Sequence, residues 1–549
     1  MKIPQVILIE VEHSPGSLAK VLATVGEAGL MVEDLNALHR TQDKTTWELT
    51  VELDDESESV LSTRVNALPN ASVIGVSDRV FDLHDGGKIR TLSRIAFKDT
   101  QVLKDVYTPG VARVCLAIQQ EPGLARRYTN LPRTVGIVTN GTAILGLGDI
   151  GPVAGLPVME GKAALFSTFG GLSGVPILID SKDVDLIVAT VAAIAPSFGA
   201  IQLEDIAAPE CFDIERRLIE RLPDTPVLHD DQHGTAVVVL AALQSAARIS
   251  GVDLATCTVG QIGLGAAGLG IVRLLRSYGV SRVLGSDLST EAQLRLESIG
   301  GLPADLEQVM AQADVVIATT GVRGLIKPQW VRTGQIIFAL SNPDPEIEPH
   351  LALESGALFA ADGKNINNVL AFPGLFRGAL DAGAGCFSDA MLLAAAEAIS
   401  LAAPTGQLIP SPLDHRVHRC VAEAVATAAR VGGHGGEEPA IGPVNVADAD
   451  EQAIQARLKS DEDFRFKAIA RRNRLLAAWA GAKLGKLEST ELSAYRIEVF
   501  RSDLEEAGDE DVLRKVAHDL AASGISNTDV RRKMDELLIH GARQIAAES

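Results

Sequence analysis

The chain has 549 residues, of which 46% are hydrophobic and 22% are charged, and its formal net charge at pH 7 is −21. This composition is typical of a folded globular protein, and the length predicts several domains rather than one. The negative charge argues against nonspecific binding to nucleic acid or anionic membranes. No uninterrupted apolar run approaches a membrane span, so we expect no membrane insertion. Five scattered cysteines without a C-x-x-C pair indicate reduced thiols in a cytoplasmic protein.

Residues 1–82 predict a small α/β domain of their own. Strand and helix patterns alternate in the order β-α-β-β-α-β, over 5–11, 18–28, 32–40, 45–53, 57–67 and 73–76. This order is that of the split ferredoxin-like motif. With the turn Pro15-Gly16 after the first strand, the region resembles an ACT domain, a small-molecule sensing module appended to many metabolic enzymes. The resemblance implies either an effector site or a purely structural dimerisation module.

Two pairs of acids follow two short apolar runs between residues 199 and 236. Glu204-Asp205 comes after the first run and Asp230-Asp231 after the second, with an amphipathic helix between them. In a parallel sheet both pairs would arrive at the carboxyl ends of strands, where ligands bind. The four acids would repel one another unless a cation neutralised them, and oxygen ligands suit Mg²⁺ or Mn²⁺. The alternative is that both pairs are solvated loop ends.

Lys162 and Tyr107 are the other candidate functional side chains of this block. Lys162 is placed near the start of an apolar helix and is followed by Ala-Ala-Leu-Phe, which indicates partial burial and a lowered pKa. Tyr107 stands before Thr-Pro-Gly. Taken alone, the lysine could be a surface residue whose stem packs on apolar neighbours, and the tyrosine could simply pack in a turn.

Residues 256–272 carry a nucleotide-binding pattern. Gly263, Gly265 and Gly268 form G-x-G-x-x-G between a predicted strand and helix, where glycines permit the turn, the approach of a pyrophosphate and close helix packing. The helix N-terminus then offers N–H groups to the phosphates. Asp287 ends the next strand about 20 residues on, where a carboxylate binds the ribose 2′-OH and repels a 2′-phosphate. NAD is therefore favoured, although nearby arginines leave NADP open.

The remaining sequence completes the domain plan. Further strands over 314–321 and 336–343 predict a doubly wound Rossmann sheet. Glycine-rich composition marks a linker over 431–450. We expect the histidines near it, His415, His418 and His434, to lie on the surface. Residues 451–549 have the charge and apolar spacing of a small helical bundle.

Six motifs in one order resemble malic enzymes of the bacterial type. They are Tyr107-Thr-Pro-Gly-Val, Glu160-Gly-Lys-Ala, Leu203-Glu-Asp-Ile, His229-Asp-Asp-Gln-His-Gly-Thr-Ala, Gly263-Leu-Gly-Ala-Ala-Gly and Leu340-Ser-Asn-Pro-Asp-Pro-Glu. The resemblance implies an α/β fold with a malic enzyme N-terminal catalytic and metal domain over 90–235 and an NAD-binding Rossmann domain over 236–430. It also implies oxidative decarboxylation of (S)-malate to pyruvate and CO₂ with NAD or NADP and Mg²⁺ or Mn²⁺.

The same resemblance assigns roles to individual residues. Lys162 would be the base for the C2 hydroxyl, Asp230 would set its protonation, and Tyr107 would protonate the enolpyruvate carbon. Metal ligands would be Glu204, Asp205 and Asp231, and the choice between Asp230 and Asp231 stays open. The cofactor would be bound by Gly263, Gly265, Ala266, Ala267, Gly268, Asp287 and Asn342. The substrate would be contacted by Asn342 and Asn368.

A second resemblance covers the end of the chain. Residues 452–476 and 508–520 are similar to the zeta subunit that inhibits the F1 ATPase in alphaproteobacteria. It implies a helical bundle over 451–549 and leaves an ATPase or another protein open as its partner. The malic enzyme and ACT resemblances both imply a homo-oligomer, a dimer or larger.

Two alternatives to a malic enzyme stay open at this point. One is a dehydrogenase or decarboxylase for another 2-hydroxy or 2-oxo acid. The other is a sensor or scaffold that has kept the fold without the activity. Its sequence mark would be loss of Lys162, Tyr107 or a metal carboxylate, and none of these is lost.

Overall fold

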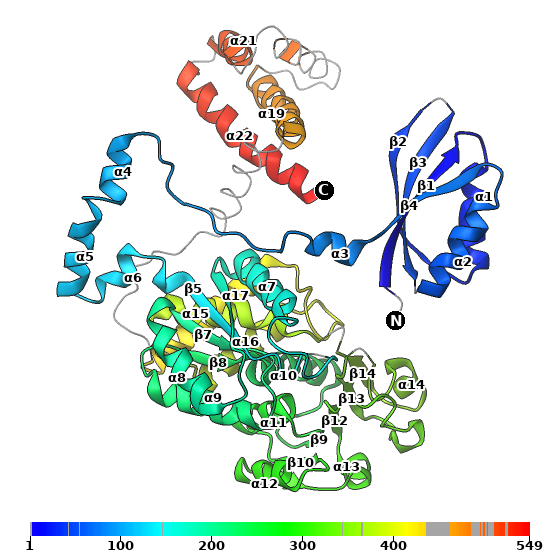
Figure 1. Ribbon diagram of the computed structural model, residues 1–549, viewed down its shortest axis with the longest axis vertical. Helices are drawn as coiled ribbons and strands as arrows, with labels where there is room; N and C mark the ends of the chain where they lie inside the picture. The colour runs from blue at the N-terminus through cyan, green and yellow to red at the C-terminus, as the bar shows by residue number, and fades with distance from the viewer. Residues whose placement is uncertain are drawn as a thin grey trace. The chain divides into compact units, whose positions relative to one another are not determined.

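The computed structural model describes residues 3–434 apart from residues 42, 54, 145, 343, 364 and 365, and towards the C-terminus residues 462–484, 495, 498, 499, 502, 510–521 and 525–548. The chain forms two compact units, residues 1–440 and 441–549 (Figure 1). Most of the predicted linker over 431–450 lies outside the described residues.

The first 80 residues form a four-stranded antiparallel sheet in the order β2-β3-β1-β4. Its elements are β1 (Ile3–Glu12), α1 (Ser17–Glu27), β2 (Val32–Arg40), β3 (Lys44–Leu53), α2 (Asp55–Asn66) and β4 (Ala71–Asp78). Alternate residues of β1, including Ile7 and Ile9, are buried in one core with Val21 of α1 and Leu61 of α2. The predicted β-α-β-β-α-β order is confirmed.

A helical segment connects this sheet to the next one. It contains α3 (Arg79–His84), α4 (Thr100–Val106), α5 (Val111–Gln120), α6 (Leu124–Tyr128) and a 3₁₀ turn, η1 (Leu131–Arg133). The Asp99 carboxylate begins α4 by accepting hydrogen bonds from the backbone N–H groups of Gln101 and Val102. Neither α4 nor α5 contains a buried residue.

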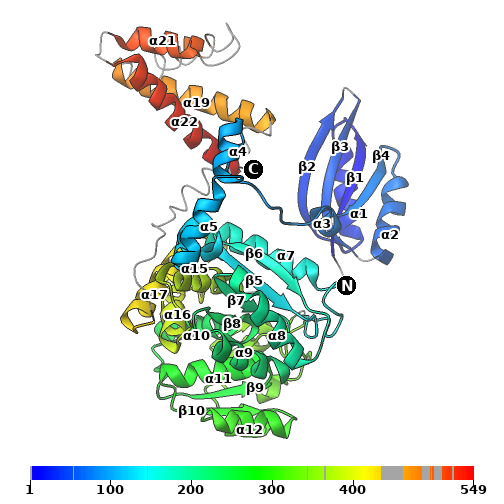
Figure 2. The same cartoon turned by 60° about the vertical axis from the view of Figure 1, so that its left-hand side comes forward.

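The first catalytic sheet has four parallel strands in the order β6-β5-β7-β8. Its strands are β5 (Thr134–Thr139), β6 (Ser173–Leu178), β7 (Ala200–Leu203) and β8 (Val227–His229). The helices between them are α7 (Leu156–Leu165), α8 (Val184–Ile194) and α9 (Glu210–Arg221). The crossover helices keep the strands parallel, so that all four end at the same edge (Figure 2).

The second catalytic sheet is parallel and doubly wound, in the order β11-β10-β9-β12-β13-β14. Its strands are β9 (Thr258–Ile262), β10 (Arg282–Ser286), β11 (Leu302–Pro303), β12 (Val315–Ala318), β13 (Ile336–Ala339) and β14 (Phe359–Asp362). The helices are α11 (Ala266–Tyr278), α12 (Thr290–Ser298), α13 (Leu306–Gln312) and α14 (Pro349–Glu354). This confirms the predicted Rossmann sheet. The strand order reverses beside β9, which is where such sheets bind ligands.

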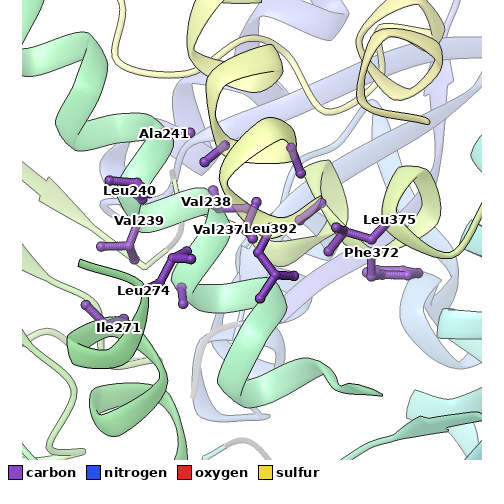
Figure 3. Close-up of a cluster of buried hydrophobic side chains, with 14 of the residues drawn as sticks. Val237, Val238, Val239, Leu240, Ala241, Ile271, Leu274, Phe372, Leu375 and Leu392 are labelled. Carbon is purple, nitrogen blue, oxygen red and sulfur yellow. The ribbon is translucent and has the colours of Figure 1, made fainter. Parts of the chain in front are cut away.

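Helix α10 (Asp230–Ser250) lies in the centre of the catalytic block. Its run from Val237 to Ala242 is buried on every side, as expected for a helix without a solvent face. Figure 3 shows the side chains from Val237 to Ala241 with Ile271 of α11 and Leu392 of α16 (Asp389–Ala402). Together with α15 (Phe372–Ala382) and α17 (His415–Val431), they form the largest core cluster. This core fixes the helix that carries Asp230 and Asp231 in its first turn.

One of the three histidines expected on the surface is buried. The ring of His418 is 1% exposed and stacks on Phe169, with 4.3 Å between the ring centroids. Its Nε2 lies 2.8 Å from the carbonyl oxygen of Pro412. The prediction was wrong because the partner ring comes from a segment far earlier in the chain.

The C-terminal unit contains the helices α19 (Glu462–Lys483), α21 (Glu510–Leu520) and α22 (Asn527–Glu548). They share a core that includes Leu476, Val516 and Met534. Within the described part of the chain, no helix is both long enough and apolar enough to cross a membrane.

Candidate active site

Two pairs of acids follow the carboxyl ends of two neighbouring strands in the first catalytic sheet. Strand β7 ends directly before Glu204 and Asp205, and β8 ends directly before Asp230 and Asp231. The two strands are parallel neighbours, so both pairs emerge at the same edge. The structure thus brings the four acids together.

Three of these acids form a cluster of oxygen ligands. One carboxylate oxygen from each of Glu204, Asp205 and Asp231 lies within 4.8 Å of the other two. Burial and the nearby Asp231 raise the pKa of Asp205 to about 8. Burial also raises the pKa of Glu204, against the opposing effect of Lys162. Since Asp205 Oδ2 is buried without a hydrogen-bond partner in the described structure, the donor set fits a hard divalent cation such as Mg²⁺ or Mn²⁺.

The backbone of Asp205 has an unusual conformation at this cluster. Its φ of 52° makes it the only residue other than glycine with a positive φ in the described chain. Such a conformation costs on the order of 1–3 kcal/mol, and the short side chain of aspartate tolerates it better than most. The backbone N–H of Asp205 donates to Asp231 Oδ2 at 2.9 Å. The strained residue therefore joins the two acid pairs directly.

Lys162 lies against the same carboxylates. Its Nζ is 2.5 Å from Asp230 Oδ2, 3.1 Å from Glu204 Oε1 and 4.4 Å from the centroid of the Phe372 ring. It belongs to the last turn of α7, not the helix start, and is only 8% exposed. Burial alone would lower the pKa of Lys162, but the carboxylates, chiefly that of Asp230, raise it above its usual value. The predicted lowering of its pKa is wrong for the protein as described.

Asp230 faces Lys162 and not the three-acid cluster. Its Oδ2 accepts from Lys162 Nζ and, at 2.8 Å, from Asn368 Nδ2. Its Oδ1 lies against Gly234, where an added Cβ would come within 1.9 Å of it. Adjacent acids in one helix turn thus have different surroundings: Asp231 joins the cluster, and Asp230 pairs with the lysine.

The three glycines of the nucleotide pattern have the three structural roles expected of them. Gly263 turns the chain with a φ of 88°, and a Cβ on Gly268 would lie 2.0 Å from the Gly263 carbonyl oxygen. A Cβ on Gly265 would meet nothing within 4 Å, which leaves room above the backbone. Helix α11 begins at Ala266 and continues with Ala267, so its first N–H groups face this space. The loop fits a pyrophosphate.

The two remaining cofactor candidates lie in loops that follow strands. Asp287 comes after β10, and its Oδ2 accepts a 2.7 Å hydrogen bond from the backbone N–H of Leu264 in the glycine loop. Asn342 follows β13 and packs against Gly363, where an added Cβ would lie 2.6 Å from its Nδ2. Asp287 is thereby tied to the glycine loop.

Tyr107 is not part of this cluster. It ends α4, and its side chain is 67% exposed. Within the described residues it makes no hydrogen bond to Lys162 or to any of the four acids. Within the part of the chain that the structure describes, a single copy therefore brings Lys162 and the four acids together without a hydrogen bond from Tyr107.

Comparison with known proteins gives the family. Residues 86–219 match the family described as malic enzyme, N-terminal domain. The NAD-dependent malic enzyme 1 of Bacillus subtilis is 50% identical over 426 residues, which are 77% of this chain and 97% of that protein. The NAD-dependent malic enzyme of Geobacillus stearothermophilus is 41% identical, over 77% of this chain and 94% of that protein. This chain belongs to the malic enzyme family. At the level of the family, the predicted oxidative decarboxylation of malate with NAD and a divalent metal is confirmed.

The solved structures agree with this membership. The malic enzyme of Pyrococcus horikoshii superposes with a TM-score of 0.63 at 37% identity, over 70% of this chain and 96% of that one. The malic enzyme of Entamoeba histolytica gives a TM-score of 0.65 at 30% identity, over 70% and 88%. Residues 445–544 match a second family, ATPase inhibitor subunit zeta, so the C-terminal unit is similar to that subunit.

Two residues near the site were not predicted from the sequence. The Phe372 ring lies against Lys162 Nζ, and the Glu215 carboxylate is buried beneath the start of α10. The sequence gives no indication of a functional role for Phe372, because a single aromatic residue in an apolar helix is typical of a hydrophobic core. For Glu215 it does give an indication: the residue stands among Cys211, Ile214 and Leu218 on the buried face of α9. An acid on an apolar helix stripe indicates a buried partner.

Proposed function

We propose that this chain oxidises (S)-malate with NAD and decarboxylates the resulting oxaloacetate to pyruvate at the site around Lys162. The observation that carries the proposal is the buried contact of Lys162 with Asp230 and Glu204, beside three clustered carboxylates. The glycine loop of the Rossmann sheet supplies the second half of the site. Membership of the malic enzyme family supports the same activity.

The acids Glu204, Asp205 and Asp231 would hold the divalent cation, and Gly263, Gly265 and Gly268 would receive the pyrophosphate of NAD. When bound, the cation supplies positive charge for the hydroxyl, the carboxylate and the developing enolate, and NAD supplies the hydride acceptor. Asn342 and Asn368 contribute amide groups beside the substrate. Asn368 also donates to Asp230 and so fixes that carboxylate next to Lys162.

Lys162 takes the proton from the C2 hydroxyl of malate in this proposal. The surrounding carboxylates now hold its pKa above the usual value, which keeps it protonated. Two of those carboxylates, Glu204 and Asp231, are proposed metal ligands, so positive charge bound there would offset their effect and lower the pKa of Lys162. Asp230 stays paired with the amine and keeps its Nζ in place between proton transfers.

We propose that Tyr107 protonates the enolpyruvate carbon of a site in another copy of the chain. The support is its exposure, the lack of any buried residue in α4 and α5, and the exposed Leu103 and Leu116 on the same segment. Exposed apolar side chains on helices that contain no buried residue are typical of surfaces that a partner covers. The oligomer would then be part of the active site.

NAD is preferred over NADP in this proposal because of Asp287. Its carboxylate is held next to the glycine loop by Leu264 and by the backbone N–H of Ser289, at 2.8 Å. A second negative charge from a 2′-phosphate would be repelled there.

The N-terminal residues 1–82 act, in this proposal, as an ACT-like regulatory module. The support is their sheet order and the way the chain leaves them: Lys88 donates from its backbone N–H to Glu160 Oε2 at 3.0 Å and from Nζ to Pro157 O at 2.7 Å. Both acceptors belong to the helix that carries Lys162. A small-molecule effector should shift the malate KM of the full chain and leave the malate KM of a chain without residues 1–82 unchanged.

The C-terminal residues 451–549 bind a protein partner in this proposal, and the match to the zeta subunit makes an F1 ATPase the first candidate. The test adds the full chain, and separately a chain without residues 451–549, to a purified F1 ATPase. Inhibition of ATP hydrolysis by the full chain alone supports the proposal. Equal rates with both chains contradict it.

The catalytic proposal is tested by measuring NADH and pyruvate formation from malate with Mn²⁺. We expect both products in equal amounts, slower turnover with NADP, and a rate lower by about 10³-fold in the Lys162→Ala variant. Equal turnover in the variant would contradict the role of Lys162. Formation of NADH from another 2-hydroxy acid but not from malate would redirect the substrate, and no NADH at all would favour a scaffold.

A further inference from the structure

We propose that Glu215 is a positioning residue of the active site, whose buried carboxylate holds the start of α10 and thereby sets where Asp230 and Asp231 stand. Glu215 lies on α9, and its carboxylate accepts hydrogen bonds from residues at the start of α10. The inference rests on the proposed metal role of Asp231 and adds a residue that touches neither metal nor substrate.

Three donors from the start of α10 converge on this one carboxylate. The backbone N–H of His229 lies 2.7 Å from Glu215 Oε1, and Gln232 Nε2 and His233 Nε2 each lie 3.1 Å from Oε2. The donors come from residues on both sides of the Asp230-Asp231 pair. A shift of the Glu215 carboxylate therefore moves the chain before and after both acids.

The carboxylate replaces a cap that α10 lacks within its own sequence. His229 is the N-cap residue of α10, and its side chain makes no capping hydrogen bond. In a capping box, a glutamate inside the helix accepts from the N–H of the N-cap residue. Glu215 accepts from that same N–H, but it reaches across from α9. The hydrogen bond consequently joins α9 to α10 and also caps the N-terminus of α10.

The position of Glu215 in the chain explains why this tie matters for both acid pairs. Helix α9 begins at Glu210, five residues after Asp205, and leads into β8, which ends directly before Asp230. Glu215 therefore lies on the helix that connects the first pair of acids to the second. Residues that orient ligand side chains from behind a metal site change metal affinity by about 10–100-fold when they are replaced.

Glu215 is buried, so it is not an ordinary charged residue on the solvent face of a helix. The residue is 7% exposed, and its side chain lies among the apolar residues of α9. Burial would raise the pKa of this carboxyl, but His233 and His229 hold it below its usual value. A buried charge with three converging donors is costly to remove, and rigid in its place.

The test replaces Glu215 with glutamine, which keeps the shape and removes the charge. Glu220→Gln, an exposed acid on the same helix, is the matched control. Mn²⁺ binding to the metal-free protein is measured by electron paramagnetic resonance, with NAD binding by fluorescence and with kcat and KM for malate. We expect Glu215→Gln to weaken Mn²⁺ binding by about tenfold or more, with NAD affinity within about twofold of the wild type. Glu220→Gln should leave all four quantities unchanged.

Further variants separate the possible outcomes. Glu215→Asp keeps the charge on a shorter arm and should weaken Mn²⁺ binding less, so it keeps the proposal testable if the glutamine variant does not fold. Unchanged Mn²⁺ affinity and kcat with a lower melting temperature would overturn the proposal, because Glu215 would then serve the fold alone. Equal losses of Mn²⁺ affinity and NAD affinity in Glu215→Gln would also overturn it. If Asp231→Asn binds Mn²⁺ as tightly as the wild type, the metal assignment itself fails, and the inference about Glu215 fails with it.

Discussion

The Lys162 cluster and the Tyr107 segment are built in opposite ways. Lys162 is 8% exposed and contacts two carboxylates and an aromatic ring, whereas Tyr107 is 67% exposed at the end of a helix without any buried residue. In the proposed mechanism, the residues for proton abstraction and metal binding therefore lie together within one copy of the chain, whereas the residue for protonation of the product does not. A buried cluster keeps its geometry when the chain is alone, while an exposed helical segment needs another surface to fix it.

The largest expected effect comes from removing the centre of the cluster. Lys162→Ala should lower kcat for malate oxidation by about 10³-fold, since a positioned acid or base contributes about 10²–10⁴-fold. The measurement is initial NADH formation at saturating malate, NAD and Mn²⁺. Lys20→Ala, a change of an exposed lysine on α1, should leave the rate unaltered. A Lys162→Ala enzyme with more than a tenth of the wild-type rate would contradict the assignment.

Replacement of the two adjacent aspartates should separate metal binding from base control. Asp231→Asn should weaken Mn²⁺ binding by about 100-fold, because it removes a charged ligand from the cluster. Asp230→Asn should retain most of the Mn²⁺ affinity and lose kcat, because it removes the partner of Lys162. Isothermal titration of the metal-free variants with Mn²⁺ makes the comparison. The reverse pattern would exchange the two roles.

Tyr107→Phe should affect protonation but not oxidation. We expect kcat for pyruvate formation to fall by about 10²-fold, while NAD and Mn²⁺ affinities stay at the wild-type level. Enolpyruvate released without protonation at the enzyme would be seen as loss of stereospecific proton incorporation: malate labelled stereospecifically with deuterium and tritium at C3 should give a chiral pyruvate methyl group with the wild type and a racemic one with the variant. Wild-type kcat and incorporation in the variant would remove Tyr107 from the mechanism.

The cluster also predicts how pH changes the stability of the metal-free protein. The pKa of Asp205 is raised from 3.8 to about 8 in the folded chain, so the folded state binds this proton more tightly than the unfolded state does. Stability should therefore fall as pH rises from about 4 to about 8. Melting temperatures in EDTA at pH 6 and pH 8 test this, and Mn²⁺ should reduce the difference. An identical pH dependence in Asp205→Asn would show that another group causes it.

The smallest expected effect concerns the nucleotide. Asp287→Ser removes the charge beside the ribose and should shift the ratio of kcat/KM for NAD over NADP by about tenfold towards NADP, a change of about 1.4 kcal/mol. Asp253→Ser, a change in an exposed turn before β9, is the control. An unchanged ratio in Asp287→Ser would mean that other groups set the preference.

The arrangement of the acids could be predicted because it follows from strand order. If both apolar runs are parallel strands of one sheet, their carboxyl ends lie at the same edge, and Glu204 and Asp230 lie there with them. The glycine loop was predictable for a similar reason: each of its glycines has a local backbone or contact requirement that spacing alone reveals. Local chemistry and sheet topology were sufficient for both.

The interactions that depend on distant segments could not be predicted. The pKa of Lys162 is governed by carboxylates from two other strands, and its apolar neighbours alone indicated the opposite direction. His418 is buried by a ring from another element, Phe169. The side chain of Tyr107 is exposed in one chain, and its proposed place at the site depends on a second copy. In each case the deciding partner is far away in sequence.

The most direct test of the contrast between the cluster and the Tyr107 segment mixes two variants of strongly reduced activity. Lys162→Ala and Tyr107→Phe chains are unfolded together, refolded as mixed oligomers, and assayed for pyruvate formation from malate. If Tyr107 serves the site of another copy, the mixture contains sites with an intact lysine and an intact tyrosine, and we expect activity well above the sum of the separate variants. Activity no greater than that sum, in oligomers shown to contain both chains, would contradict the account.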